Sequence, residues 1–272
     1  MGLIYQPGAV TPLGAAAVLD KSDDDRFNSD VQRPSLAQTF RTNDSGATFT
    51  PVINHLKSKG SSAGADGDTD SGDGQGLSNA TRTAAAEALA DWLATDPTGH
   101  GDSGFLILGD LNAYAQEDPL QALEQGADDI DGTADDFANL VADTTYSYSF
   151  DGQWGALDHA LANGTLSDLV AGAGKWHVNA DEPTVLDYNT EFKSVGQVNS
   201  FYAADAFRSS DHDPVLVGLN LGEAVTGTTR GEVLVGTEGP DLIRAGQGRD
   251  GVVGGGGNDR FVFSSQIGRA HV

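Results

Sequence analysis

Hydrophobic positions along the chain follow two different periods, which predict one long helix among many short strands. Residues 79–95 repeat apolar side chains at helical spacing, and Thr81 is a candidate N-cap of that helix. The apolar stripe consists of Ala85, Leu89, Trp92 and Leu93. We interpret the stripe as a surface that packs against the core, because such stripes are far more often core contacts than ligand contacts.

Short apolar or alternating runs predict the strands. Phe105–Leu108 and Val215–Leu219 are continuous apolar runs, as expected of buried strands. Gln38–Arg41 and Phe49–Asn54 flank the turn Asn43–Gly46 and predict a hairpin. Further strands are predicted at residues 3–5, 15–19, 146–150 and 157–161, and a second helix at residues 119–125.

The pattern changes near residue 222, where a glycine-rich period of nine residues begins. Residues 254–262 match G-G-x-G-x-D-x-U-x at every fixed position, and Asp241, Asp250 and Asp259 recur in register. In such repeats the glycines allow tight turns, the apolar residue fills a narrow core, and Asp binds Ca²⁺ between turns. We expect this part of the chain to be disordered without calcium, because its clustered carboxylates repel one another.

These patterns divide the chain into one large domain and a small appendage. The predicted parts are a domain at residues 1–221, a linker at 222–226, calcium-binding repeats at 227–263 and a tail at 264–272. The large domain is long enough to bury its own core. The repeats predict a short calcium β-roll.

Composition and charge narrow the classes of function. The 272 residues hold 15 Lys and Arg against 40 Asp and Glu, a net charge of −25, which argues against a broad basic face for nucleic acid. The chain has no cysteine, which excludes disulfides and thiolate metal sites. It has no apolar run long enough for a membrane span, and its first residues lack the features of a signal peptide.

An acidic, glycine-rich loop at residues 60–78 contains a partial calcium-loop pattern. Asp66, Asp68 and Asp70 have the spacing of the first ligands of an EF-hand, but Ser71 and Leu77 stand where that loop needs Gly and Glu. We therefore predict a solvated loop. The second acidic segment, residues 128–136, has no assigned role.

Polar residues that carry chemistry gather at predicted strand ends and on the adjoining loops. The four clusters are Asn54 with His55, Asp110 with Asn112, Asp158 with His159, and Asp211 with His212. Metal-assisted cleavage of a phosphodiester uses such a mixture. One carboxylate binds a divalent cation, a second orients water, an amide holds a phosphate oxygen, and a histidine paired with an aspartate moves protons.

Several motifs resemble the endonuclease/exonuclease/phosphatase superfamily, which includes pancreatic-type deoxyribonucleases and abasic-site endonucleases. They are GDLN at 109–112, LDH at 157–159 and SSDHDP at 209–214. Residues 54–59, 79–83 and 148–152 look like the secreted bacterial nucleases of the ExeM/NucH type, which can carry repeats-in-toxin tails. The resemblance covers residues 1 to about 221, and the ordered set of motifs is specific.

The resemblance implies roles for five residues of these clusters. Asp110 would orient the attacking water, and Asn112 would bind the scissile phosphate. His212 would contact that phosphate and transfer a proton while Asp158 holds its ring. Asp211 would be a ligand of Mg²⁺ or Mn²⁺.

The resemblance also implies roles on the loop that follows the second strand of the predicted hairpin. His55 would be an acid near the leaving oxygen, and Lys57 and Lys59 would contact phosphate. The alternative for each of these residues, and for each aspartate above, is a strand-end cap or a loop charge. His159 and His177 receive no role.

The fold implied by the resemblance is α/β, a two-sheet αββα sandwich built from two related halves. Residues 1–221 match the second half and part of the first, so we expect a partial sandwich. The family supplies an early Asn and a Glu metal ligand upstream of the segment that looks like Leu3–Tyr5. Because no such stretch precedes Leu3, we expect low or absent activity from these residues alone.

Three functions fit the sequence. The first is an extracellular, metal-dependent nuclease acting on DNA or RNA, with DNA favoured. It carries a calcium-binding tail, and the sequence indicates no obligate protein partner. The second is a phosphodiesterase or phosphatase of the same fold acting on lipid or sugar phosphates. The third is a non-enzymatic, secreted calcium-binding surface protein. By resemblance, the repeats also imply one-step export of the type I kind from a Gram-negative bacterium.

Overall fold

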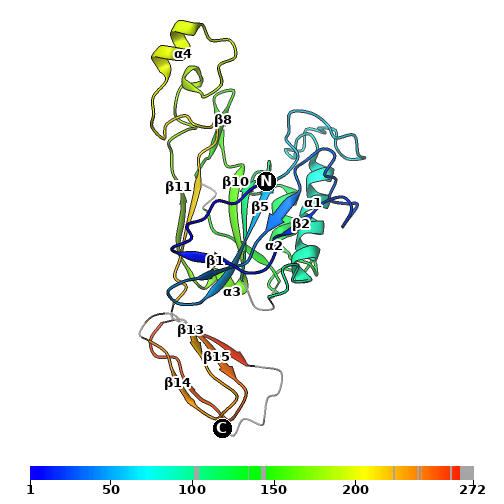
Figure 1. The fold of residues 1–272 in the computed structure, drawn as a ribbon. Helices are drawn as coiled ribbons and strands as arrows, with labels where there is room; N and C mark the ends of the chain where they lie inside the picture. The colour runs from blue at the N-terminus through cyan, green and yellow to red at the C-terminus, as the bar shows by residue number, and fades with distance from the viewer. Residues whose placement is uncertain are drawn as a thin grey trace.

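The computed structural model describes residues 1–100, 104–133, 135–141, 145–222, 224–237, 239, 241–257 and 259–263. A large α/β domain carries a narrow appendage of short strands at its C-terminal end (Figure 1). The predicted tail at 264–272 lies outside the described residues. No helix within the described ranges has the length and apolarity that crossing a membrane requires.

One mixed sheet forms the centre of the large domain. Its strand order is β1-β4-β5-β6-β10-β7, with β3 also on β5 and β2 on β3. The pair β5–β6 is parallel, whereas the other pairs of this sheet are antiparallel. The strands are β1 (Val10–Pro12), β2 (Ala17–Leu19), β3 (Ser35–Ala37), β4 (Phe40–Thr42), β5 (Thr48–His55), β6 (Gly104–Asp110), β7 (Phe137–Asn139) and β10 (Asp158–Asn163).

Helices cover one face of this sheet. The helices α1 (Asn79–Ala94) and α2 (Asp118–Glu124) are the predicted pair, and Leu89 and Leu93 of α1 belong to the same core cluster as Ile107 of β6. The apolar stripe expected at residues 79–95 therefore does form the main core. Its burial is the chief favourable contribution to the fold.

A second, smaller sheet covers the opposite face. It consists of β11 (Val170–Lys175) and β12 (Val215–Leu219), which pair antiparallel. Val217 and Leu219 pack against Leu106 and Leu166, the latter on the short helix α3 (Gly164–Ser167). Helices, a large sheet and a second sheet thus form successive layers, which confirms the expected α/β sandwich.

An irregular arm extends beyond the end of the sandwich. We define the distal arm as residues 176–208, which contain the 3₁₀ helix η1 (Thr184–Leu186) and the helix α4 (Val195–Phe201). Below it lies the hairpin of β8 (Tyr148–Phe150) and β9 (Gln153–Gly155), and Figure 1 shows both above the strand ends of the central sheet.

The glycine-rich repeats form a parallel β-roll. One side holds β13 (Ala224–Thr226), β15 (Leu242–Gly246) and β17 (Arg260–Phe263), and the other holds β14 (Val233–Val235) and β16 (Gly251–Val253). Residues 18 apart are register partners, so each turn of the roll uses two nine-residue repeats. Leu234, Ile243 and Ala245 fill its narrow core. The predicted β-roll is confirmed.

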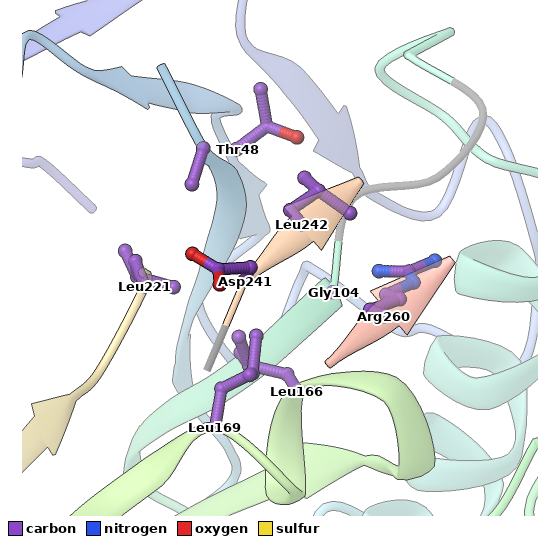
Figure 2. Close-up of a pocket in the computed structure, with 9 residues that line it drawn as sticks. Thr48, Gly104, Leu166, Leu169, Leu221, Asp241, Leu242 and Arg260 are labelled. Carbon is purple, nitrogen blue, oxygen red and sulfur yellow. The ribbon is translucent and has the colours of Figure 1, made fainter. Parts of the chain in front are cut away.

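The roll packs against the end of the sandwich. Figure 2 shows Asp241, Leu242 and Arg260 beside Leu166 and Leu169 of the large domain, around a cavity of only about 10 Å³. Asp241, one of the predicted calcium ligands, is buried at this junction. The two parts therefore share a packed interface rather than a bare linker.

Two local predictions were wrong. Residues 3–5 are not a strand, and the first strand is β1 at Val10–Pro12, because edge pairing with β4 decides the strand and not local propensity. Thr81 is not the N-cap of α1. The cap position is Ser78, at φ 63°, and Thr81 instead donates its backbone N–H (2.9 Å) and its hydroxyl (2.7 Å) to Asp68. Asp68 is fully buried, so the acidic loop is anchored rather than wholly solvated.

Candidate active site

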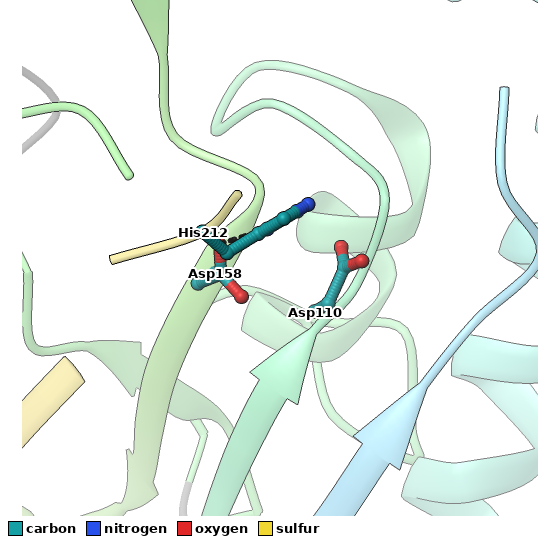
Figure 3. A group of neighbouring side chains, drawn as sticks. All are labelled: Asp110, Asp158 and His212. Atoms are coloured by element: carbon teal, nitrogen blue, oxygen red, sulfur yellow. Dashed lines mark hydrogen bonds and ion pairs between the residues drawn. The ribbon is translucent and has the colours of Figure 1, made fainter. Parts of the chain in front are cut away.

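Three neighbouring strands end in a row of polar side chains. The parallel pairing of β5 and β6 makes His55 the register partner of Asp110. The antiparallel pairing of β6 and β10 makes Asp110 the partner of Asp158. Because register partners lie side by side, the three residues form one line across the edge of the sheet. The loop before β12 brings His212 to this line (Figure 3).

The Asp158 carboxylate orients the ring of His212. Its Oδ2 atom lies 2.7 Å from Nδ1 of His212 and accepts a hydrogen bond of 2.6 Å from the hydroxyl of Ser147. That hydroxyl accepts the backbone N–H groups of Leu157 (3.2 Å) and Asp158 (3.1 Å) in turn. Ser147 is buried, so the carboxylate and the imidazole are held by a hydrogen-bonded chain with little freedom.

The turn at residues 109–112 fixes the second carboxylate. Oδ1 of Asp110 accepts the backbone N–H of Asn112 at 2.8 Å, and the side-chain amide of Asn112 donates to Oδ2 at 3.1 Å. The same amide donates to the carbonyl of Leu56 at 3.1 Å. Gly109 has φ +130°, and a Cβ there would stand 2.1 Å from the carbonyl oxygen of Asn54, so only glycine fits.

Burial and neighbouring charges shift the pKa values of Asp110 and His212. Burial and the nearby Asp158 carboxylate raise the pKa of Asp110 to about 6. Burial alone would lower the pKa of His212, but its hydrogen bond to Asp158 and the charges of Asp158 and Asp110 raise the pKa to about 8. Near neutral pH the site therefore holds an ionised Asp110 and a protonated His212.

His55 stands on the other side of Asp110 in a neutral form. The guanidinium of Arg33 lies 2.8 Å from Nδ1 of His55, and because a guanidinium only donates, the ring proton is on Nε2. Nε2 lies 3.6 Å from Oδ2 of Asp110. Burial, with the positive charges of Arg33 and His212, lowers the pKa of His55. Its partner in the sequence cluster, Asn54, is buried and hydrogen-bonded to Ser35.

The structure gives both predicted phosphate-binding lysines partners within the chain. The ammonium of Lys57 donates to the carbonyls of Ser58 (2.9 Å) and Ser61 (2.8 Å). Lys59 forms an ion pair with Glu117, whose pKa is raised by burial despite that pair. These contacts fasten the acidic loop, and the phosphate contacts of both lysines stay predictions.

Asp110, Asp158 and His212 form a group suited to a metal ion. One ligand atom from each lies within 4.8 Å of the others. Carboxylate oxygens are ligands that divalent cations take, and the imidazole of His212 can join them only in its unprotonated form. Asp211 is exposed on the loop that carries His212, and its negative charge contributes to the raised pKa of His212.

A second Asp–His pair, which the sequence patterns did not reveal, holds the loop that carries His212. The buried carboxylate of Asp213 lies 2.8 Å from Nδ1 of His177 and accepts the backbone N–H groups of Val178 (3.1 Å), Asn179 (2.8 Å) and Ala180 (3.0 Å). The amide of Asn179 donates to the carbonyl of His212 at 2.6 Å. The loop of His212 is therefore tied to the distal arm.

His159, which received no role, is a core residue. It is buried next to Asp158 on β10, and its Nε2 lies 2.9 Å from the carbonyl of Ala113. Burial lowers the pKa of His159, so the ring is neutral at physiological pH and donates that hydrogen bond. It supports the turn after Asp110.

In the β-roll, acidic side chains satisfy backbone groups one turn away. Asp250 accepts the backbone N–H of Glu232 at 3.0 Å, and Asp259 accepts that of Asp241 at 3.1 Å. Asp241 also accepts the backbone N–H of Thr237 at 2.5 Å. The three predicted calcium ligands thus occupy equivalent positions in successive repeats.

Sequence comparison places both parts of the chain. Residues 19–212 match the Endonuclease/Exonuclease/phosphatase family, and residues 226–261 match the RTX calcium-binding nonapeptide repeat in four copies. No curated protein matches the chain. The nonapeptide repeats bind calcium, which agrees with the period of nine residues.

Solved structures resemble the chain at low identity. The human Nocturnin catalytic domain is 16% identical with a TM-score of 0.36, covering 59% of this chain and 50% of its own. A family protein of Bacteroides thetaiotaomicron is 12% identical with a TM-score of 0.42, covering 63% and 56%. A mannosyl-6-phosphatase of the same species is 14% identical with a TM-score of 0.46, covering 79% and 68%. The chain thus spans about half the length of the first two.

Proposed function

The chain belongs to the Endonuclease/Exonuclease/phosphatase family, and on that basis we propose that it is an extracellular, metal-dependent nuclease that hydrolyses phosphodiester bonds of DNA. The observation that carries the proposal is the row of His55, Asp110 and Asp158 at three adjacent strand ends, with His212 bonded to Asp158. This arrangement brings an ionised carboxylate and a protonated imidazole to one point. In the hydrolysis of a phosphate diester, such a carboxylate can act on the attacking water and such an imidazolium can stabilise the phosphate.

A Mg²⁺ or Mn²⁺ ion fits the site because the candidate ligand atoms converge within 4.8 Å and are mostly carboxylate oxygens. Asp158 of that group would hold the ion, and we propose Asp211, which lies outside the group on the loop of His212, as a further ligand. When bound, such an ion neutralises the negative charge that builds on the phosphate. Asp110 is then left to face the attacking water.

The side chains divide the remaining work. Asp110, held by the backbone and amide of Asn112, orients water and takes its proton. The imidazolium of His212 donates a hydrogen bond to a phosphate oxygen, while Asp158 and Ser147 fix its direction. Asn112 would contact the scissile phosphate by exchanging its hydrogen bond to the carbonyl of Leu56 for one to a phosphate oxygen. The Nε2–H of His55 would face the leaving oxygen.

The β-roll supports the extracellular part of the proposal. Repeats of this type need calcium, which is abundant outside cells, and the net charge of −25 suits a medium in which cations screen repulsion. Asp241, Asp250 and Asp259 are the proposed calcium ligands.

A panel of substrates tests the proposal. The full chain, saturated with Ca²⁺, would be incubated with Mg²⁺ or with EDTA and supplied with supercoiled plasmid, RNA, a sugar monophosphate or a phospholipid dispersion. We expect weak plasmid nicking that requires Mg²⁺ and disappears in His212→Ala. Release of phosphate from the sugar, or hydrolysis of the lipid, without nicking would replace nuclease by phosphatase or lipid phosphodiesterase.

A further inference from the structure

A cleft of about 410 Å³ opens beside the catalytic pair, between the β8–β9 hairpin and the distal arm. Its walls include Tyr148, Phe150, Tyr188, Arg208 and Asp211. The ring of Tyr148 lies against the ring of His212, with centroids 4.5 Å apart. One wall of the cleft therefore adjoins the catalytic histidine. Its volume lies in the range of ligand sites, which runs from about 300 to 1,000 Å³.

Arg208 is placed in this cleft at a structural cost. The residue is 7% exposed and has φ 52°, a left-handed conformation that is unfavourable for arginine. Its Nη1 donates to the carbonyl of Asn179 at 2.7 Å, whereas its Nε is buried without a hydrogen-bond partner among the described residues. A buried donor without a partner is costly, and one that lines a cleft is satisfied when an acceptor binds there.

Two exposed aromatic side chains line the cleft together with Arg208. Phe150 is 64% exposed and Tyr188 is 71% exposed, although large apolar groups are usually covered. The rings of Tyr148 and Phe150 are nearly parallel, with 10° between their planes and centroids 6.4 Å apart. Exposed rings beside a cation are how proteins hold unpaired bases and the phosphates between them.

The carboxylates that line the cleft limit where an anion can bind. Asp187 forms an ion pair with Lys193, and Asp211 lies at the catalytic end as a proposed metal ligand. Asp151 belongs to the exposed turn of the hairpin. The position of Arg208 is therefore the favourable one for a phosphate, and the rings are left to contact bases.

We propose that this cleft binds the unpaired nucleotides next to the phosphodiester that is cut, with one phosphate on Arg208 and bases stacked on Phe150 and Tyr188, so that the preferred substrate is single-stranded nucleic acid. The inference rests on the proposed nuclease function. Paired bases in a duplex are already stacked on one another and do not offer their faces to the rings.

Binding of labelled oligonucleotides tests the cleft separately from cleavage. The probe is a fluorescein-labelled oligothymidylate of about eight nucleotides, within the usual span of such sites, measured by anisotropy with the full chain in Ca²⁺ and no Mg²⁺. The variants are Arg208→Gln, Phe150→Ala and, as a matched control on the roll, Arg230→Gln. A duplex of the same length is the comparison ligand.

We expect Arg208→Gln to weaken binding of the single strand about tenfold and to lower the slope of log Kd against log salt by about 0.7, the loss of one phosphate contact. Phe150→Ala should weaken binding about tenfold without changing that slope, and Arg230→Gln should change neither. Wild type should bind the duplex more weakly than the single strand.

Three results would contradict the proposal that this cleft binds single-stranded nucleic acid. They are equal affinity of wild type for duplex and single strand, unchanged affinity in Arg208→Gln, and weaker binding in that variant with an unchanged salt slope. The last result would mean that Arg208 only holds the carbonyl of Asn179. Oligonucleotide binding that depends on Arg208, without any Mg²⁺-dependent cleavage, would instead contradict the proposed nuclease function. The proposed binding site in the cleft would still stand.

Discussion

Asp110 and Asp158 are register partners on β6 and β10, so two carboxylates meet at the end of one strand pair, beside a single imidazole. The Asp158 carboxylate disfavours ionisation of Asp110, and a positive charge close to both offsets this repulsion. The imidazolium of His212 supplies such a charge. The site is therefore a concentration of negative charge that attracts cations.

Replacing Asp158 should lower the pKa of His212. In Asp158→Asn the imidazole keeps its burial but loses the paired charge, so its pKa should fall from about 8. In wild type the raised pKa contributes stability that is fully present below pH about 6.5 and is lost as pH rises through about 8. NMR titration of the histidine signals in metal-free buffer measures the shift.

The exposed Asp205→Asn on the distal arm is the control for that titration. It should leave the pKa of His212 near 8. An unchanged pKa in Asp158→Asn would mean that the hydrogen bond between the two residues does not govern the ring.

Replacing Asp110 should abolish hydrolysis and stabilise the fold at alkaline pH. The folded pKa of Asp110 is about 6, above the ordinary value of 3.8, so the contribution of this group is present below pH about 4 and is lost as pH rises through 6. Above pH 6 the ionised carboxylate is destabilising. Asp110→Asn removes that charge and should add on the order of 1–2 kcal/mol at pH 8 and almost nothing at pH 4.

Urea unfolding of wild type and Asp110→Asn at the two pH values, in EDTA, measures this difference. A variant that is less stable than wild type at pH 8 would contradict the raised pKa and would give the carboxylate a purely structural role.

Replacing Asp213 should lower both the stability of the fold and the rate of hydrolysis, although Asp213 is not expected to contact the substrate. Asp213→Asn alters the hydrogen bond with His177 and loses part of the set of backbone hydrogen bonds that hold residues 178–180. We expect a loss of about 2–3 kcal/mol of stability and a rate of hydrolysis at least tenfold lower, because His212 is tied to this segment through Asn179. Denaturant unfolding and initial rates measure the two effects.

The same exposed residue, Asp205, serves as the control for this variant. If Asp213→Asn lost stability but kept the wild-type rate at a temperature where it is folded, this second Asp–His pair would not position His212.

Removing calcium should unfold the roll. Its carboxylates are close together, and its core contains few apolar side chains, so EDTA should abolish the β-type circular dichroism of this part and Ca²⁺ should restore it. Asp259→Asn should require several-fold more Ca²⁺ than wild type, whereas Asp205→Asn should not. Circular dichroism that does not respond to Ca²⁺ would contradict a calcium-dependent fold.

Sequence reasoning placed correctly the residues that lie directly beside a recognisable strand or repeat. Asp110 and Asp158 each adjoin an apolar run that becomes a strand, and strand pairing then brings them together. The repeat of nine residues likewise determines the roll, because each turn repeats the same contacts.

The residues that sequence reasoning missed act across long separations. Ser147 contacts Asp158 from 11 residues away, and His177 contacts Asp213 from 36 residues away. Neither residue lies in a recognisable motif, so only the fold reveals the pair. Lys59 shows the converse, since its partner Glu117 lies 58 residues away and could not be inferred from a loop pattern.

The pairing of Asp158 with His212 in hydrolysis is tested most directly by a double-mutant cycle on plasmid nicking. Initial rates would be measured with Mg²⁺ and Ca²⁺ for wild type, Asp158→Ala, His212→Ala and the double variant, with His100→Ala as a control outside the site. We expect weak nicking by wild type and the control, a loss of about 100-fold or more in each single variant, and no further loss in the double variant. Losses that multiply in the double variant would contradict a hydrolytic site built on this pair.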